Sequence, residues 1–165
     1  MSSISAKLRI RNQYVRVAFA EFLGTCILII FGDGSVAQSV TSSSSKGEFI
    51  SINWSWCMAV MFGAFSCVNV SGGHINPAVS LAMALIGRLK WTLLPVYMLA
   101  QYLGAFVGAS IVYLVYFEAI KNFSGGVMLT DPMYTNATAG IFSTYPQSYL
   151  TAGEGLADQV TQTVQ

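Results

Sequence analysis

The chain of 165 residues is 54% apolar and only 9% charged, and its formal net charge is +1. Since a soluble domain carries about 25% charged residues, this composition excludes an ordinary soluble protein and indicates an all-α membrane protein. The small net charge, without a basic cluster interleaved with aromatic residues, gives no indication of nucleic-acid binding.

Residues 1–13 are predicted to form a cytoplasmic tail. This segment lacks the apolar region of a cleavable signal peptide, so the first apolar stretch after it must act as its own insertion signal. Cations cluster before the first and third apolar stretches of the chain, at Lys7, Arg9, Arg11, Arg16, Arg88 and Lys90. Because loops rich in Lys and Arg stay in the cytoplasm, this pattern predicts a cytoplasmic N-terminus.

Three apolar stretches are long enough to cross a hydrocarbon core about 30 Å thick. Their approximate limits are 17–40, 50–70 and 93–117, inside a membrane domain of residues 14–117. Small residues recur at every fourth position within each stretch, as Ala59, Gly63 and Cys67 do in the second. Because small residues let helix backbones approach closely in lipid, we expect three packed transmembrane helices.

The stretch from Ser71 to Ile86 is apolar but too short to cross a membrane. Its apolar run covers about 16 Å as a helix, near half of the hydrocarbon core. Asn76 is a strong N-cap and Pro77 suits the first helical position, so a short helix is predicted to begin at Pro77. Irregular backbone such as residues 72–74 survives at membrane depth only where protein buries it or where it lines a wet cavity. Residues 71–86 are therefore predicted to be a re-entrant loop and half-helix beside a pore.

Several segments of the chain resemble the aquaporin family. GGHINPAVS at 72–80 resembles the first signature loop of that family. Three further segments resemble the family's flanking pattern: AEFLGT at 20–25, FGDGSVAQ at 31–38 and AQYLGAFVGA at 100–109. Two segments, GRLKW at 87–91 and FSTYP at 142–146, resemble the glycerol-conducting branch of the family, the aquaglyceroporins. The resemblance implies three transmembrane helices plus one re-entrant half-helix, as in the first repeat of the aquaporin fold.

The resemblance also implies a function. It indicates a passive transmembrane channel for water, glycerol and other small neutral solutes, which works without cofactor, metal or covalent chemistry. It further implies a homotetramer in the plasma membrane, in which each subunit has its own pore. No Ser/His/Asp arrangement, phosphate-binding loop or carboxylate pair in the sequence indicates an enzyme.

One departure from the family pattern leaves a second interpretation open. The family is a tandem inverted repeat with two signature loops, whereas this sequence contains one such loop. Residues 155–165 look like the truncated start of the family's fourth span. The alternative function is therefore that of a truncated, non-conducting membrane protein that at most associates with full-length subunits.

The re-entrant loop is expected to supply the polar groups of the pore. Its candidate residues are Gly72, Gly73, His74, Asn76, Pro77 and Ala78. The carbonyl oxygens of the first three would accept hydrogen bonds from a solute, the Asn76 amide would donate them, and the half-helix dipole would oppose cations. The single histidine is expected to brace the loop, since it has neither a second histidine for a metal site nor a partner for catalysis.

Glu21 is an acid inside the first apolar stretch, where a carboxylate is costly unless it is bonded. The resemblance implies that this carboxylate accepts hydrogen bonds from the backbone of a pore loop and so sets the direction of that loop's carbonyls. A protonated acid bonded to a neighbouring span is the alternative interpretation.

Trp56 lies twenty residues before Asn76. Aquaglyceroporins present a large aromatic side chain to the outer pore mouth at this spacing, so the resemblance implies that Trp56 lines the pore. Val60, one helical turn further on, would continue the same wall. Interfacial tryptophans otherwise belong to the membrane belt, an interpretation that stays open for Trp56 and is preferred for Trp54.

Residues 118–154 are predicted to form an extracellular loop, because they are rich in Gly, Ser, Thr and Pro. Asn122 and Asn136 match the pattern of glycosylation acceptors, and Asn136 is the better candidate because it lies further from the membrane. Asn53 and Asn69 match the same pattern inside the second span, where we expect no glycan.

Overall fold

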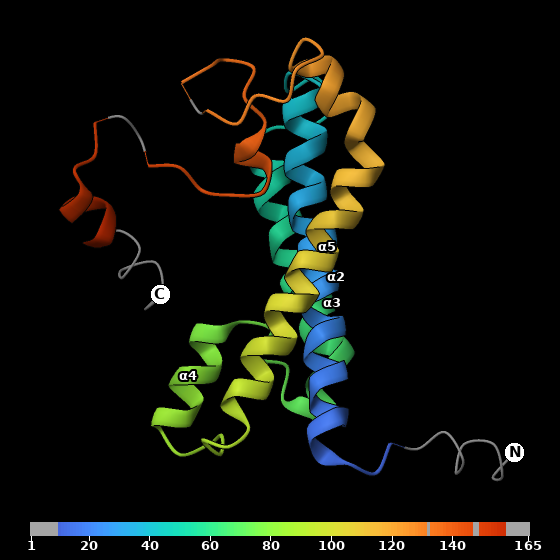
Figure 1. Cartoon of the computed structure of the whole chain (residues 1–165), viewed down its shortest axis with the longest axis vertical. Coiled ribbons are helices and arrows are strands. Elements are labelled where there is room, and N and C mark those ends of the chain that lie inside the picture. Colours follow the sequence, from blue (N-terminus) through green and yellow to red (C-terminus); the bar gives the residue numbers. More distant parts are fainter. Residues whose placement is uncertain (1–9, 132, 147–148, 158–165) are drawn as a thin grey trace, which may run out of the picture.

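The computed structural model describes residues 10–131, 133–146 and 149–157 (Figure 1). The helices in these ranges are α2 (Gln13–Thr41), α3 (Phe49–Ser71), α4 (Pro77–Leu85), α5 (Leu94–Phe123) and the 3₁₀ helix η1 (Ala139–Ile141). Of these, α2, α3 and α5 are long and apolar enough to cross a membrane. The predicted fold of three transmembrane helices and one half-helix is confirmed.

The helices α2 and α5 extend beyond their predicted limits. α2 begins earlier than residue 17, because the Asn12 side chain caps it by accepting a hydrogen bond of 2.9 Å from the backbone N–H of Tyr14. α5 continues past residue 117, so residues 118–123 are helical and the predicted loop starts too early. The physical reason is Ile120, which is buried in an apolar cluster and extends the packed face of the helix.

Helix α2 lies between α3 and α5 and contacts both (Figure 1). The buried residues of α3 are Ala59, Gly63 and Cys67, the predicted series of small residues. A methyl group added at Gly63 would come within 2.6 Å of the Gly24 carbonyl oxygen of α2. One added at Gly108 of α5 would come within 2.9 Å of another α2 carbonyl oxygen. Glycine is therefore what lets both neighbours approach the backbone of α2.

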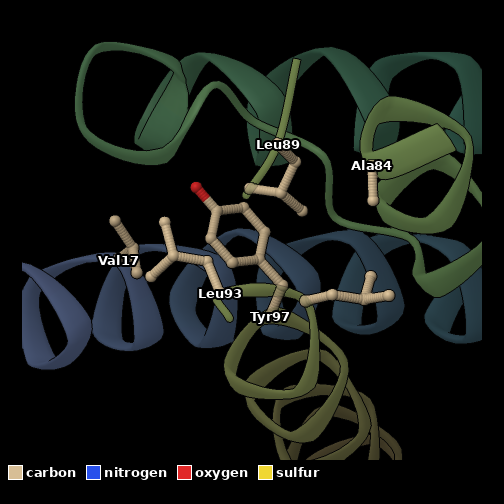
Figure 2. Packing of buried hydrophobic residues seen from close by; sticks show 6 residues of the cluster. Val17, Ala84, Leu89, Leu93 and Tyr97 are labelled. Carbon is tan, nitrogen blue, oxygen red and sulfur yellow. The ribbon is translucent and has the colours of Figure 1, made fainter. Parts of the chain in front are cut away.

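After α3 the chain turns back, and α4 runs beside the first part of α5 (Figure 1). A buried apolar cluster joins α4 to the adjoining ends of α2 and α5 through Val17, Ala84, Leu89, Leu93, Leu94 and Tyr97. In Figure 2 the Tyr97 ring lies among the side chains of this cluster. A helix as short as α4 is marginal on its own, so this burial is what holds it in place.

The loop after α5 folds back over the adjoining ends of α2 and α5. Ile141 of η1 is 2% exposed and packs with Ala37 of α2 and with Val112 and Ile120 of α5. Apolar packing by one short helical turn therefore anchors a segment whose composition is otherwise that of a loop.

Residues 152–157 are helical and begin at a polar cap. The Glu154 carboxylate accepts hydrogen bonds from the backbone N–H of Thr151 at 2.9 Å and from its hydroxyl at 2.8 Å. These two hydrogen bonds lower the pKa of Glu154. Residues 158–165, the rest of the predicted start of a fourth span, and residues 1–9 of the predicted tail lie outside the described residues.

Gly63→Ala should loosen the packing of α3 on α2, whereas Gly34→Ala should not. At position 63 the methyl group meets backbone, so we expect the free energy of unfolding to fall by about 1–3 kcal/mol. At Gly34 nothing lies within 4 Å of an added methyl group, and alanine is favoured over glycine in a helix by about 0.5–1 kcal/mol. Unfolding by SDS in mixed micelles, followed by circular dichroism, measures both variants. Equal stability of the two would contradict this packing.

Candidate functional site

The Glu21 carboxylate holds the re-entrant loop against α2. Glu21 is fully buried, and its two carboxylate oxygens accept hydrogen bonds from the backbone N–H groups of His74 at 3.0 Å and Ile75 at 2.7 Å. The Gln101 side chain of α5 donates a third hydrogen bond at 2.8 Å. A buried carboxylate is costly without donors, so these three groups make the position of Glu21 tolerable.

These hydrogen bonds also set the direction of two carbonyl groups. In a trans peptide the C=O and N–H groups point in opposite directions, and the described chain contains no cis peptide. Since the N–H groups of His74 and Ile75 point at Glu21, the carbonyl groups of Gly73 and His74 point away from it. No residue that the structure describes donates a hydrogen bond to either of these oxygens.

The loop backbone is strained at one position that sequence analysis did not select. Ile75 has φ of 44°, in the left-handed region that a β-branched residue rarely adopts, at a cost of about 1–3 kcal/mol. Gly72 at 94° and Gly73 at 68° share the region without that cost. Ile75 is 6% exposed, and its side chain fills the space beside Gly24 and Gly63. Burial of this side chain holds the loop in its strained form.

A second set of hydrogen bonds joins α4 to the loop through Ser80. The Gln101 side chain donates to the Ser80 hydroxyl oxygen at 2.9 Å, and that hydroxyl lies 3.2 Å from the Asn76 carbonyl oxygen, which accepts from it. The Ser80 oxygen also lies 3.1 Å from Nδ1 of His74. Sequence analysis missed Ser80, whose only signal was a hydroxyl one turn after Asn76 in an otherwise apolar run.

His74 is held on two sides. Besides its contact with Ser80, its ring lies against the Tyr97 ring of α5, with ring centroids 5.0 Å apart. The Tyr97 hydroxyl in turn donates a hydrogen bond of 2.7 Å to the Ser71 carbonyl at the end of α3. Tyr97 therefore links the half-helix cluster to the start of the loop.

Asn76 caps α4 and leaves its amide open. Its side-chain oxygen accepts a hydrogen bond of 2.8 Å from the backbone N–H of Ala78, and Pro77 occupies the first helical position. Asn76 is exposed, and its NH₂ group donates to no residue in the described part of the chain. The loop thus presents unbonded acceptors from Gly73 and His74 together with an unbonded donor from Asn76.

The aromatic candidates of α3 lie apart from this hydrogen-bond network. The Trp56 ring packs on Gly32 of α2, where an added methyl group would collide with it. Val60 is 49% exposed and Trp54 is 68% exposed. Trp56 also borders a cavity of about 350 Å³ together with Asp33 of α2 and residues 140–144 of the loop after α5. From the sequence, Asp33 lies near the far end of the first apolar stretch and is expected only to meet interfacial water, so it is not among the candidate residues.

Asn136 lies in a turn of the loop after α5 and is partly exposed. Across the described residues, no group of three or more His, Cys, Asp or Glu side chains is placed to hold a metal ion. Cys26 and Cys67 are buried, whereas Cys57 is exposed, and none of them forms a disulfide in the described chain.

Three apolar crossing helices and a short helix that turns back beside them define an integral membrane protein with a re-entrant loop. Residues 9–165 match the family model described as major intrinsic protein. The chain is 47% identical to human aquaporin-9 over 162 residues, which cover 98% of this chain and 54% of that protein. It is 48% identical to aquaporin-10 of Milnesium tardigradum over 160 residues, 97% of this chain and 39% of that protein.

The fold is similar to the X-ray structure of the aquaglyceroporin from Plasmodium falciparum. The TM-score is 0.62 at 39% identity, over 66% of this chain and 45% of that chain. The chain spans about half the length of the relatives it matches, or less. It belongs to the major intrinsic protein family, the aquaporins.

Glu21→Gln should release the loop. Glutamine has one acceptor oxygen and an NH₂ group, so at least one of the loop N–H groups loses its acceptor at a cost of about 1–3 kcal/mol. We expect the amides of His74 and Ile75 to exchange hydrogen about tenfold faster or more, because each 1.4 kcal/mol is a factor of about ten. Hydrogen-exchange mass spectrometry on the chain in nanodiscs measures this. Glu118→Gln, at an exposed acid of α5, is the control, and unchanged loop exchange in Glu21→Gln would contradict the role of the carboxylate.

Proposed function

We propose that this chain forms half of the wall of a passive channel for water, glycerol and other small neutral solutes. The observation that carries the proposal is the open polar face of the loop. The Glu21 hydrogen bonds turn the carbonyls of Gly73 and His74 away from α2, and the Asn76 amide remains an unbonded donor. The chain's family membership and its similarity to an aquaglyceroporin structure support the same function.

Permeation of a polar solute requires that lost hydrogen bonds be replaced. Each hydrogen bond that water or a polyol gives up on leaving bulk water raises the barrier by kilocalories unless the wall replaces it. The loop offers acceptors for solute hydroxyl groups and a donor for solute oxygens. The N-terminus of α4 carries about half a positive charge, which disfavours cations at that level. Such a channel needs no cofactor and catalyses no covalent chemistry.

Trp56 and Val60 are proposed to extend this wall toward the outer mouth. Trp56 is held by its packing on Gly32, and an indole face can receive the C–H side of a polyol while polar groups opposite receive its hydroxyls. Val60 lies one helical turn further along the exposed side of α3. Trp54, largely exposed, fits the membrane belt.

The second candidate function is that of a non-conducting subunit. Asn76 and most of α3 are exposed, and among the described residues nothing lies opposite the loop to close a pore. In lipid, each unbonded polar group of the loop would cost several kilocalories. A conducting pore therefore needs a second wall, which a further half of the same type or a partner subunit could supply. We propose a homotetramer in the plasma membrane on the basis of the family resemblance.

A comparison of two proteins tests the proposed function. The 165-residue chain alone, reconstituted into vesicles, should give water and glycerol permeabilities no higher than those of empty vesicles. A chimera that continues this chain with the remaining C-terminal part of human aquaporin-9 should conduct both, because the second wall is then present. Stopped-flow light scattering in glycerol and sucrose gradients measures both permeabilities. A folded, inactive chimera would refute the channel proposal, and a chain that conducts by itself would refute the half-wall proposal.

Variants of the same chimera test the outer wall. Trp56→Ala should widen the outer mouth, so we expect discrimination among polyols of different length to weaken more than water permeability falls. Trp54→Ala is the matched control and should leave the polyol ratios unchanged. Identical ratios in Trp56→Ala and the unmodified chimera would assign Trp56 to the membrane belt instead.

The orientation is proposed to place the N-terminus in the cytoplasm and the loop after α5 outside. Cations cluster before α2 and before α5, which favours this direction of insertion. Expressed in a glycosylating eukaryotic cell, the chain should carry a glycan at Asn136 that endoglycosidase removes and Asn136→Gln abolishes. Asn53 and Asn69, inside α3, should stay unmodified, and a glycan on either would reverse the proposed topology.

A further inference from the structure

The outer half of α2 carries a buried acid that the loop does not use. Asp33 is 7% exposed, yet its carboxylate makes no hydrogen bond or ion pair with any residue that the structure describes. Glu21, the other buried acid of α2, has three donors. Its carboxylate oxygens are not fully enclosed by protein and open onto the space beside them. Among the described residues no donor reaches Asp33, so its two oxygens are available to a molecule in that space.

Asp33 borders a half-open cavity of a size that suits a small molecule. The cavity has a volume of about 350 Å³, at the lower end of the range of about 300–1,000 Å³ that is usual for small-molecule sites. Three elements form it: one face of α2, the Trp56 ring of α3 and residues 140–144 of the loop after α5. Packing of Ile141 against α2 and α5 holds the loop over this space.

The chemistry of the lining selects a class of ligand. The carboxylate offers two acceptor oxygens and a negative charge, and the Trp56 ring, fixed on Gly32, offers an aromatic face. Ile29 and Val36 add apolar surface on either side of Asp33. A carboxylate beside an indole suits a cation with an apolar or planar body, because the charge is attracted by both groups. A neutral polyol could occupy the lone pairs of the carboxylate but would leave its charge uncompensated.

We propose that the cavity between Asp33 and Trp56 binds a small organic cation, of the alkylammonium or guanidinium type. The cation donates N–H hydrogen bonds to the Asp33 carboxylate and places its body against the Trp56 ring. The site shares the Trp56 ring with the proposed outer wall of the pore, but its test measures binding and not permeation, so the two proposals can fail separately.

The test uses Trp56 as a fluorescent probe. The sequence contains three tryptophans, so Trp54→Phe and Trp91→Phe together leave Trp56 alone. This chain, in phosphatidylcholine nanodiscs at constant ionic strength, is titrated with methylguanidinium and, in parallel, with methylurea, a planar molecule of similar shape without charge. We expect saturable change in Trp56 emission with methylguanidinium and none with methylurea.

Variants of the acid complete the test. Asp33→Asn keeps the size of the side chain and removes its charge, so we expect the affinity for methylguanidinium to fall by about tenfold or more. Asp33→Glu should retain part of the affinity, and Glu118→Gln, at an exposed acid near the outer end of α5, should retain all of it. Circular dichroism establishes that each variant is folded. Three results would each overturn the proposal: saturation by methylurea, an affinity for methylguanidinium in Asp33→Asn equal to that of the chain with Asp33, or no saturable response in the single-tryptophan chain that retains Asp33.

Discussion

The hydrogen bonds to the Glu21 carboxylate are the interaction on which the rest of the structure depends. Glu21 lies on α2, the helix between the other two spans, and its donors come from the loop and from α5. A hydrogen bond to a charged group contributes about 1.5–3 kcal/mol, so three of them outweigh the strain of one left-handed residue. Without the carboxylate, two loop amides would be buried unbonded. The same contact that stabilises the loop also turns its carbonyls outward.

Both small and large residues are needed to hold the loop in its position. Gly24 and Gly63 let α2 and α3 approach until backbone nearly meets backbone, and the remaining space beside them is occupied by Ile75. A larger residue at either glycine would both separate the two helices and displace the Ile75 side chain. Helix packing and loop conformation therefore depend on the same limited volume, since protein interiors are close-packed and respond to the addition of a single methyl group.

Much of this arrangement could be predicted from sequence, because it follows from local chemistry. Apolar length predicts the spans, Asn76 and Pro77 predict the start of α4, and an acid inside an apolar stretch predicts that Glu21 needs partners. Ile75 could not be predicted, because its left-handed backbone follows from the two hydrogen bonds and the volume around it. Tertiary packing of Ile120 likewise extends α5 beyond the point where its sequence turns polar.

Several polar groups of the loop and of the helices around it fall into two sets. Glu21 and Ser80 are bonded within the chain, whereas the carbonyls of Gly73 and His74, the Asn76 amide and the Asp33 carboxylate are not. Water is absent from the hydrocarbon core, so a polar group there must face protein or a wet path. The open carbonyls of Gly73 and His74 follow from the way Glu21 orients the loop, and the open Asn76 amide follows from the capping of α4 by its oxygen, so both are consequences of the fold. Since lipid cannot satisfy them, the face that carries them has to be covered by protein or wetted by a path for polar solutes.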